Sequence, residues 1–270
     1  MVLFIIMQNK VKDKTIIVTG ASSGIGERLV WEIARNGGKP VMLARSQEKL
    51  YELQRQLQTE LKATSCVYPV DLSDENQTEQ TVVKILSEHP IIHALINNAG
   101  IGMFDYVKDV NWNDVKDMFD LNVLSLIKLT HLLLPHFINK QDGHIINVAS
   151  QAGKIATPKS SIYASTKHAV IGFSNALRIE MKQENVQVTT VNLGPVRTNF
   201  FELADPHGSY QKNVERYMLD PEKVAKKITQ HLFSNRREIN LPWWMELGSK
   251  FNYLFPKTLE KLLKKQFNQK

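Results

Sequence analysis

The fold of this chain is decided by residues 15–26, which read TIIVTGASSGIG. The first five of these residues are all β-branched, which is typical of a buried strand. Glycines follow at positions 20, 24 and 26, and residues 27–36 then have helical periodicity. Glycine allows a tight turn, and the start of a helix presents free N–H groups at its positive end. The stretch therefore predicts a strand–turn–helix unit that binds a phosphate group.

Outward from this stretch, short β-branched runs alternate with longer segments of helical periodicity. This alternation is typical of parallel strands joined by crossover helices, with both faces of the sheet covered. The predicted fold class is α/β, a doubly wound, Rossmann-like parallel sheet that binds its ligand at the carboxyl ends of the strands. The expected strands are residues 15–19, 40–44, 66–70, 93–97, 143–149 and 187–193, and the expected helices are residues 27–36, 47–61, 74–88, 112–137 and 161–183, with another starting at Pro221.

The length and composition of the chain fit one domain. With 270 residues and 43% hydrophobic content, the chain can bury a single large core. We expect one domain over residues 1–270, with its core over about residues 12–240 and a basic amphipathic tail over residues 241–270. A single cysteine, Cys66, excludes an internal disulfide. Residues 1–7 are apolar but lack the features of a secretory signal and are too few to span a bilayer, so we expect a cytoplasmic location.

The net charge of +7 is concentrated near the C-terminus. Residues 236–270 hold eight lysines and arginines against three glutamates, a balance of +5. No nucleic-acid partner is expected, because this excess lies in an amphipathic tail and no recognition module is found.

The tail itself has the pattern of a basic amphipathic helix. Residues 258–267 place Leu259, Leu262, Leu263 and Phe267 on one helical face bordered by lysines, and aromatic runs precede them at residues 243–244 and 251–255. Such a segment can make peripheral contact with an anionic membrane. We favour the alternative that the tail packs on the substrate pocket or on a second subunit, because most amphipathic helices of soluble folds pack on protein.

The end of the second strand indicates which dinucleotide binds. Many NAD-binding folds place an acidic residue there for the ribose diol, whereas NADP binders place a cation near the 2′-phosphate. Here the strand ends at Ala44 and is followed by Arg45, whose guanidinium suits a phosphate. The residues therefore favour NADP(H) over NAD(H). Asp71, after the third strand, either contacts the adenine or caps the helix that begins near Asp74.

Tyr163 and Lys167 are the candidate acid/base pair, since residues at i and i+4 of a helix meet on one face. A neighbouring ammonium favours the phenolate and lowers the pKa of a tyrosine from about 10 toward working pH. The pair would serve as general acid in carbonyl reduction or general base in alcohol oxidation. Ser150, at the end of a strand, could polarise the substrate oxygen. Asn122 could hold a water that links Lys167 to solvent.

No metal site is expected. His131, His136 and His144 have no acidic or cysteine partner at metal-ligand spacing, and Cys66 has no second ligand near it.

Together these motifs resemble those of the short-chain dehydrogenase/reductase family, of the single-domain, NADP-preferring type. The resemblance covers about residues 14–198. The glycine motif of the family matches residues 20–26, its Asn-Asn-Ala-Gly motif matches residues 97–100, and its tetrad matches Asn122, Ser150, Tyr163 and Lys167. The resemblance implies direct hydride transfer between nicotinamide and the substrate carbon without a metal, with Lys167 also bonded to the nicotinamide ribose.

The resemblance also implies partners and a set of cofactor contacts. The substrate would be a small carbonyl or alcohol compound, and the protein a homo-dimer or homo-tetramer. Val196 and Thr198 would contact the carboxamide. The implied cofactor-binding residues are Gly20, Ser22, Ser23, Gly24, Ile25, Gly26, Arg45, Asp71, Leu72, Asn98, Ala99, Gly100, Tyr163, Lys167, Val196 and Thr198.

Two departures from the family pattern affect the cofactor site. Leu193-Gly194-Pro195 replaces the usual Pro-Gly, which would shift the backbone near the carboxamide, and Ser23 stands where some NADP-preferring relatives have a basic residue. The latter leaves Arg45 to bind the 2′-phosphate largely alone.

Residues 200–219 correspond to the region that covers the substrate in the family. They are aromatic and apolar, which predicts a hydrophobic carbonyl compound as substrate. The alternative function is that of a catalytically silent dinucleotide sensor or scaffold with the same fold, although such a protein has no need of an intact tetrad.

Overall fold

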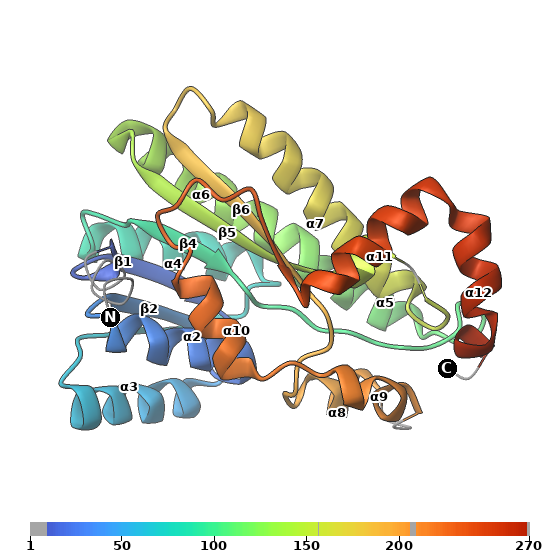
Figure 1. Ribbon diagram of the computed structural model, residues 1–270. Helices are drawn as coiled ribbons and strands as arrows, with labels where there is room; N and C mark the ends of the chain where they lie inside the picture. Colours follow the sequence, from blue (N-terminus) through green and yellow to red (C-terminus); the bar gives the residue numbers. More distant parts are fainter. Residues whose placement is uncertain (1–9, 156, 206–208, 269–270) are drawn as a thin grey trace.

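The structure is a computed structural model, and it describes residues 10–155, 157–205 and 209–268. A parallel sheet runs through the molecule in the strand order β3-β2-β1-β4-β5-β6-β7 (Figure 1). This order, which reverses between β1 and β4, confirms the predicted doubly wound fold. The strands are β1 (Thr15–Thr19), β2 (Lys39–Ala44), β3 (Cys66–Pro69), β4 (Ala94–Asn97), β5 (Gly143–Ser150), β6 (Val186–Leu193) and β7 (Glu238–Leu241).

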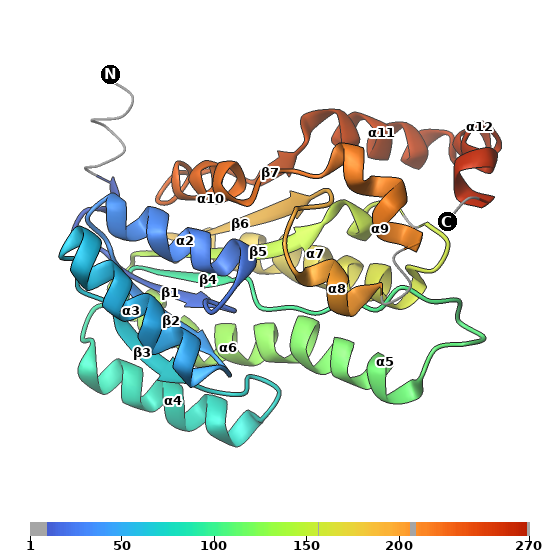
Figure 2. The same cartoon turned by 90° about the horizontal axis from the view of Figure 1, so that it is seen from below.

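Helices cover both faces of this sheet (Figures 1 and 2). One face carries α2 (Gly24–Arg35), α3 (Gln47–Leu61) and α10 (Pro221–Thr229). The other carries α4 (Glu75–Glu88), α6 (Ser125–Lys140) and α7 (Ser161–Glu180). Residues of β1 alternate between the two cores, with Ile16 and Val18 in one and Ile17 in the other. Because both faces are buried, the strand has no exposed side, and residues 16–18 between its two terminal threonines are all apolar.

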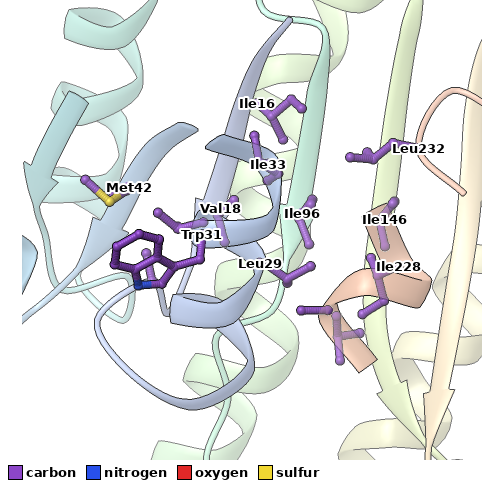
Figure 3. Packing of buried hydrophobic residues seen from close by; sticks show 14 of the residues in the cluster. Ile16, Val18, Leu29, Trp31, Ile33, Met42, Ile96, Ile146, Ile228 and Leu232 are labelled. Atoms are coloured by element: carbon purple, nitrogen blue, oxygen red, sulfur yellow. The ribbon is translucent and has the colours of Figure 1, made fainter. Parts of the chain in front are cut away.

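The core under α2 and α10 holds the switch point of the sheet together. Figure 3 shows side chains of β2, β1, β4 and β5 close to side chains of these two helices and of the turn after α10. The labelled residues include Ile16, Val18, Ile96 and Ile146 from the strands, Leu29 and Ile33 from α2, and Ile228 and Leu232 from α10 and its following turn.

Most predicted elements have bounds within one to three residues of those observed. The helix expected at residues 27–36 begins at Gly24, because glycines of low helix propensity are accepted in a first turn that closes the phosphate loop. β7 was not predicted, since its four residues include Glu238 and Asn240 and its register comes from pairing with β6.

The long helix expected at residues 112–137 is continuous but not regular. It consists of α5 (Trp112–Phe119), a π-helical turn η1 (Asp120–Leu124), and α6. Among the described residues, this helix over 112–140 is the one segment long and apolar enough to cross a membrane by length and composition. Leu129, Leu133 and Phe137 of it are fully buried in the core of the protein. Wide turns of this kind are frequent at functional sites, and this one contains Asn122.

Two further groups of helices lie beyond the carboxyl ends of the strands (Figure 2). The region expected to cover the substrate forms α8 (Phe200–Ala204), α9 (Ser209–Val214) and a 3-10 turn η3 (Glu215–Tyr217). The tail forms α11 (Trp243–Leu254) and α12 (Pro256–Asn268), which includes the predicted helix at residues 258–267.

Candidate active site

A cleft of about 1380 Å³ opens at the carboxyl ends of the strands, where the sequence predicts the ligand. It is lined from the glycine turn after β1, across the ends of β2, β3, β4 and β5, to α7 and α11. All but two of the predicted site residues line it, namely Gly20, Ser22, Ser23, Gly24, Ile25, Arg45, Asp71, Leu72, Asn98, Ala99, Gly100, Ser150, Tyr163, Lys167, Val196 and Thr198. The other two, Gly26 and Asn122, are buried behind the wall of the cleft.

The glycine turn requires glycine for a geometric reason. A Cβ atom added to Gly26 would lie 2.1 Å from the carbonyl oxygen of Gly20, so the turn could not close around a larger residue. Gly24 has a φ of +56°, in the left-handed region that favours glycine. Ser23, the residue before α2, makes no side-chain capping bond, which leaves the first-turn N–H groups for a ligand. These features fit a pyrophosphate group.

Asn98 has a positioning role as well as a place in the lining. Its backbone N–H donates to Oγ1 of Thr19, and its side-chain Nδ2 donates to the Thr19 carbonyl oxygen, both at 2.9 Å. Two bonds thus join the loop after β4 to the end of β1, beneath the glycine turn.

Two cations stand at the far end of the cleft from the tyrosine. Arg45 follows β2 as predicted, and Lys49 lies one turn into α3. Both side chains are exposed and line the same cleft. Our sequence reasoning missed Lys49, although it stands only four residues after Arg45 in the same segment that follows β2. Arg45 is therefore not the only cation available to a 2′-phosphate.

The hydrogen bonds around Asp71 exclude one of its two predicted roles. Asp74, not Asp71, caps α4, because an Oδ1 of Asp74 accepts from the N–H of Gln77 at 3.0 Å. Asp71 instead accepts from the N–H of Ser73 at 3.0 Å within the loop. The capping alternative for Asp71 is wrong, and its contact with the adenine stays a prediction.

Tyr163 and Lys167 meet on one face of α7, as their spacing predicts. The Lys167 Nζ lies 5.7 Å from the centroid of the Tyr163 ring and donates to the carbonyl oxygen of Val148 at 3.1 Å. The lysine side chain is buried between α7 and β5, and this burial lowers its pKa to about 8. A cation is thus held against the phenol ring at the wall of the cleft.

Asn122 is held by protein groups. Its Oδ1 accepts from the N–H of Ile101 at 2.8 Å, and its Nδ2 donates to the carbonyl oxygen of Ile101 at 2.8 Å and to Oγ1 of Thr166 at 3.2 Å. Thr166 precedes Lys167 on α7, so Asn122 ties the loop after β4 to the helix that carries the lysine. The predicted water-binding role of Asn122 stays a prediction.

Ser150 ends β5 at the cleft wall. Its Oγ donates to the carbonyl oxygen of Leu193 at 3.2 Å and accepts from the N–H of Ala152 at 3.1 Å. Both bonds fix where the hydroxyl lies, and the side chain remains in the lining of the cleft.

Aromatic rings surround the tyrosine. The Tyr163 ring centroid is 5.5 Å from that of Phe104 and 5.8 Å from that of Phe200, and Phe201 stacks on Phe104 at 6.0 Å. Phe200 and Phe201 come from the region predicted to cover the substrate. Phe104 comes from the loop after β4, and nothing in its local sequence distinguishes it from a structural residue.

No group of three histidine, cysteine or acidic residues able to hold a metal ion occurs within residues 10–155, 157–205 and 209–268. His144, considered above as a ligand, is fully buried in the core.

A doubly wound sheet with a glycine turn at its first crossover and a tyrosine–lysine pair at its carboxyl edge defines a class of oxidoreductases. This chain belongs to the short-chain dehydrogenase family, whose model matches residues 14–207. The family predicted from the sequence, and with it an enzyme of the dehydrogenase/reductase type, is confirmed.

Relatives and solved structures agree with this assignment. An NADP-dependent 3-hydroxy acid dehydrogenase of Schizosaccharomyces pombe is 34% identical over 86% of this chain and 91% of its own length. A dehydrogenase/reductase SDR family protein 7-like of Drosophila melanogaster is 30% identical over 86% of this chain and 73% of its own.

Among solved structures, the closed form of a serine dehydrogenase complexed with NADP⁺ has a TM-score of 0.74 and 28% identity, covering 83% of this chain and 94% of that one. A short-chain dehydrogenase/reductase of Burkholderia phymatum in complex with NAD has a TM-score of 0.83 over 93% of this chain and 96% of that one. At 20% identity, this second likeness shows the fold alone.

Proposed function

We propose that the protein is an NADP(H)-dependent oxidoreductase that interconverts a hydrophobic carbonyl compound and its alcohol, with Tyr163 as general acid/base. The observation that carries this proposal is the buried Lys167 ammonium, 5.7 Å from the centroid of the Tyr163 ring, in a cleft that also contains the glycine turn. A tyrosine held beside a cation next to a dinucleotide site has the chemistry that carbonyl reduction requires.

NADP(H) is the proposed cofactor. The turn over residues 20–26 would hold the pyrophosphate on the N-terminus of α2, and Arg45 and Lys49 would hold the 2′-phosphate. The S. pombe relative, which is named NADP-dependent, supports this choice. When bound, the cofactor supplies or accepts the hydride.

Residues of the chain supply the proton that the substrate oxygen gains in reduction. In reduction, the Tyr163 O–H donates its proton to the substrate oxygen as the carbon gains hydride, and the products are the alcohol and the oxidised cofactor. The Lys167 ammonium stabilises the phenolate that is left behind. The Ser150 hydroxyl, at the wall of the same cleft, would turn from the carbonyl oxygen of Leu193 to donate its hydrogen bond to the substrate oxygen and polarise the carbonyl.

A hydrophobic substrate is proposed from the surroundings of the tyrosine. Phe104 and Phe200 have ring centroids within 6 Å of that of Tyr163, and Phe201 stacks behind them. Apolar walls of this kind exclude water from the reacting carbonyl and favour apolar substituents next to it.

The test is NADPH consumption over a panel of steroids, 3-oxoacyl thioesters, 3-oxo acids, quinones, sugars and aromatic aldehydes, repeated with NADH. For the substrate that is found, Tyr163→Phe is expected to lower kcat by at least about a hundredfold. The matched control is Tyr51→Phe, which changes an exposed tyrosine on α3 and leaves kcat unchanged.

Two results would overturn the proposal. Full turnover by Tyr163→Phe would contradict the role of the tyrosine. Tight NADPH binding without turnover of any carbonyl in the panel would favour the alternative function, that of a silent dinucleotide sensor or scaffold.

The cytoplasmic location and the homo-dimeric or homo-tetrameric state expected from the sequence stay predictions. Size-exclusion chromatography with light scattering tests the second of them.

A further inference from the structure

We propose that the outer face of α11 binds the surface of an anionic lipid bilayer, with the mouth of the cleft turned toward the lipid so that a lipophilic substrate enters from the membrane. The proposed membrane binding does not depend on the proposed function, whereas the entry of substrate from the membrane rests on it. We call the set Trp244, Leu247, Phe251, Leu254 and Phe255 the α11 stripe.

The α11 stripe is an apolar surface at helical spacing. Its members stand at i, i+3, i+7, i+10 and i+11, which places them on one face of α11 and its C-terminal end. They are between 40% and 67% exposed. Single exposed apolar residues are common on soluble proteins, but a contiguous row of aromatic and leucine side chains marks a binding surface.

The stripe adjoins the mouth of the cleft. Trp244, Met245 and Gly248 of α11 and Leu259 of α12 line the cleft itself. Trp244 belongs to both surfaces, and its ring centroid is 5.6 Å from that of Tyr217, another lining residue. The stripe and the cleft therefore share Trp244, which places the apolar surface directly beside the cleft.

An exposed apolar side chain of α8 also lines the cleft. Leu203 of α8 lines the cleft and is 74% exposed. Figure 2 shows α8, α9, α11 and α12 together beyond the carboxyl ends of the strands. A flat surface that covers the stripe would thus lie over the opening between these helices.

The charge around the stripe selects an anionic partner. Lys250, Lys257 and Lys261 are exposed on α11 and α12 beside one exposed glutamate, Glu260, and Lys250 also lies 3.8 Å from the carboxylate of Glu246. The one acidic residue of α11, Glu246, is turned inward, and its carboxylate accepts from Nζ of Lys154 at 2.6 Å. Helices that lie on membranes combine lysines with Trp, Phe and Leu in this way. The core of an interface between protein chains is instead depleted in lysine, which argues against a second copy as the occupant.

The ion-paired lysine also fixes the helix in place. Lys154 Nζ donates to Glu238 of β7 at 2.7 Å and to Glu246 of α11, so α11 is bound to the edge of the sheet. A movement of α11 away from this position would break the ion pair between Lys154 and Glu246.

The experiment is co-sedimentation of the full chain with vesicles of phosphatidylcholine alone or of phosphatidylcholine mixed with phosphatidylglycerol. The protein is expected to pellet with the anionic vesicles and much less with the neutral ones. The double variant Leu247→Ser/Phe251→Ser is expected to lower the partition coefficient at least about tenfold.

The matched control is Val83→Ser/Ile179→Ser, which removes two apolar side chains that are 64% and 73% exposed on α4 and α7. It should pellet like the unchanged protein. A second pair of double variants tests the contribution of charge. Lys250→Glu/Lys257→Glu should weaken binding to anionic vesicles about tenfold. Lys62→Glu/Lys182→Glu, at positions just after α3 and α7, should have little effect. Thermal melting checks that each variant is folded.

Equal pelleting of the α11 double variant and its control would overturn the binding proposal. So would a dimer, measured without vesicles, that Leu247→Ser/Phe251→Ser dissociates, because the stripe would then join two copies of this chain.

Substrate entry is tested with one long-chain carbonyl presented in anionic vesicles and one water-soluble carbonyl. Leu247→Ser/Phe251→Ser should lower kcat/KM about tenfold for the first and leave the second unchanged. Equal losses for both substrates would overturn the orientation of the mouth toward the lipid. Vesicle binding without turnover of either compound would refute the proposed function and leave the membrane surface standing.

Discussion

The side-chain amide of Asn122 forms a reciprocal pair with the backbone of Ile101: Oδ1 accepts from the Ile101 N–H and Nδ2 donates to the Ile101 carbonyl oxygen, both at 2.8 Å. The pair joins the loop after β4 to the π-helical turn η1. Since Nδ2 also reaches Thr166, the residue before Lys167, one amide holds together the loop after β4 and the helix that carries Tyr163 and Lys167.

Asn122→Asp tests this arrangement. The carboxylate can still accept from the N–H of Ile101 but cannot donate to its carbonyl oxygen, and it introduces a buried negative charge. We expect kcat/KM to fall at least about tenfold and the melting temperature to fall by several degrees. Asn76→Asp, at an exposed position on α4, is the control. Unchanged turnover by Asn122→Asp would show that the amide does not position the site.

Lys167→Met tests the cost of the buried ammonium. Burial lowers the pKa of Lys167 to about 8, so near neutral pH the folded protein holds a charge that the unfolded chain leaves in water. The substitution should abolish turnover. When stability is measured without cofactor, it should raise the free energy of unfolding by about 1–3 kcal/mol near pH 7.

The pH dependence of this effect follows from the direction of the shift. Between pH 8 and 10.5 the unfolded chain binds more protons than the folded protein, so the stability of the unchanged protein rises through this window. The advantage of Lys167→Met should therefore shrink as the pH rises. Urea unfolding across this window measures it, with the exposed Lys182→Met as control. A constant difference would contradict the lowered pKa.

Arg45→Ala and Lys49→Ala test the cofactor choice. Each is expected to weaken NADPH binding about tenfold, the loss of one charge-assisted contact, and to leave the Kd for NADH within about twofold. Fluorescence titration with the two nucleotides gives both constants, and Lys62→Ala at the end of α3 is the control. Equal losses for NADPH and NADH would mean that these cations do not bind the 2′-phosphate.

His144 should make the folded protein less stable in acid. Burial lowers its pKa to about 3, and its ring is held by the N–H of Phe233, which donates to Nδ1, and by Oγ1 of Thr189. Because the unfolded chain binds a proton below the ordinary value of 6.5, this residue contributes stability above pH 6.5 that is lost as the pH falls toward 3.

His144→Gln isolates that contribution. The unchanged protein should lose about 2 kcal/mol more stability than His144→Gln between about pH 7 and pH 5. Urea unfolding at the two pH values measures the difference. His168→Gln, at an exposed position on α7, should follow the unchanged protein, and identical pH slopes for all three proteins would contradict the assignment.

Much of this site could be predicted because its parts are local in sequence. The glycine turn depends on backbone sterics over seven residues, and the pairing of Tyr163 with Lys167 depends on the helical repeat. Lys49 was missed although its signal was also local. Phe104 and Trp244 had no local signal, since each reaches the cleft only through the packing of a loop or of α11 against distant elements.

The amino-acid sequence by itself determined the α/β class, the position of the phosphate turn and the family, because hydrophobic periodicity and glycine sterics act over a few residues. Only the tertiary structure decided that β7 joins the sheet, that Asn122 binds Ile101, and that Glu246 faces Lys154 while the α11 stripe faces outward. These contacts join residues from 21 to 92 positions apart. They depend on which faces remain to be covered once the sheet has formed, and no local pattern specifies that.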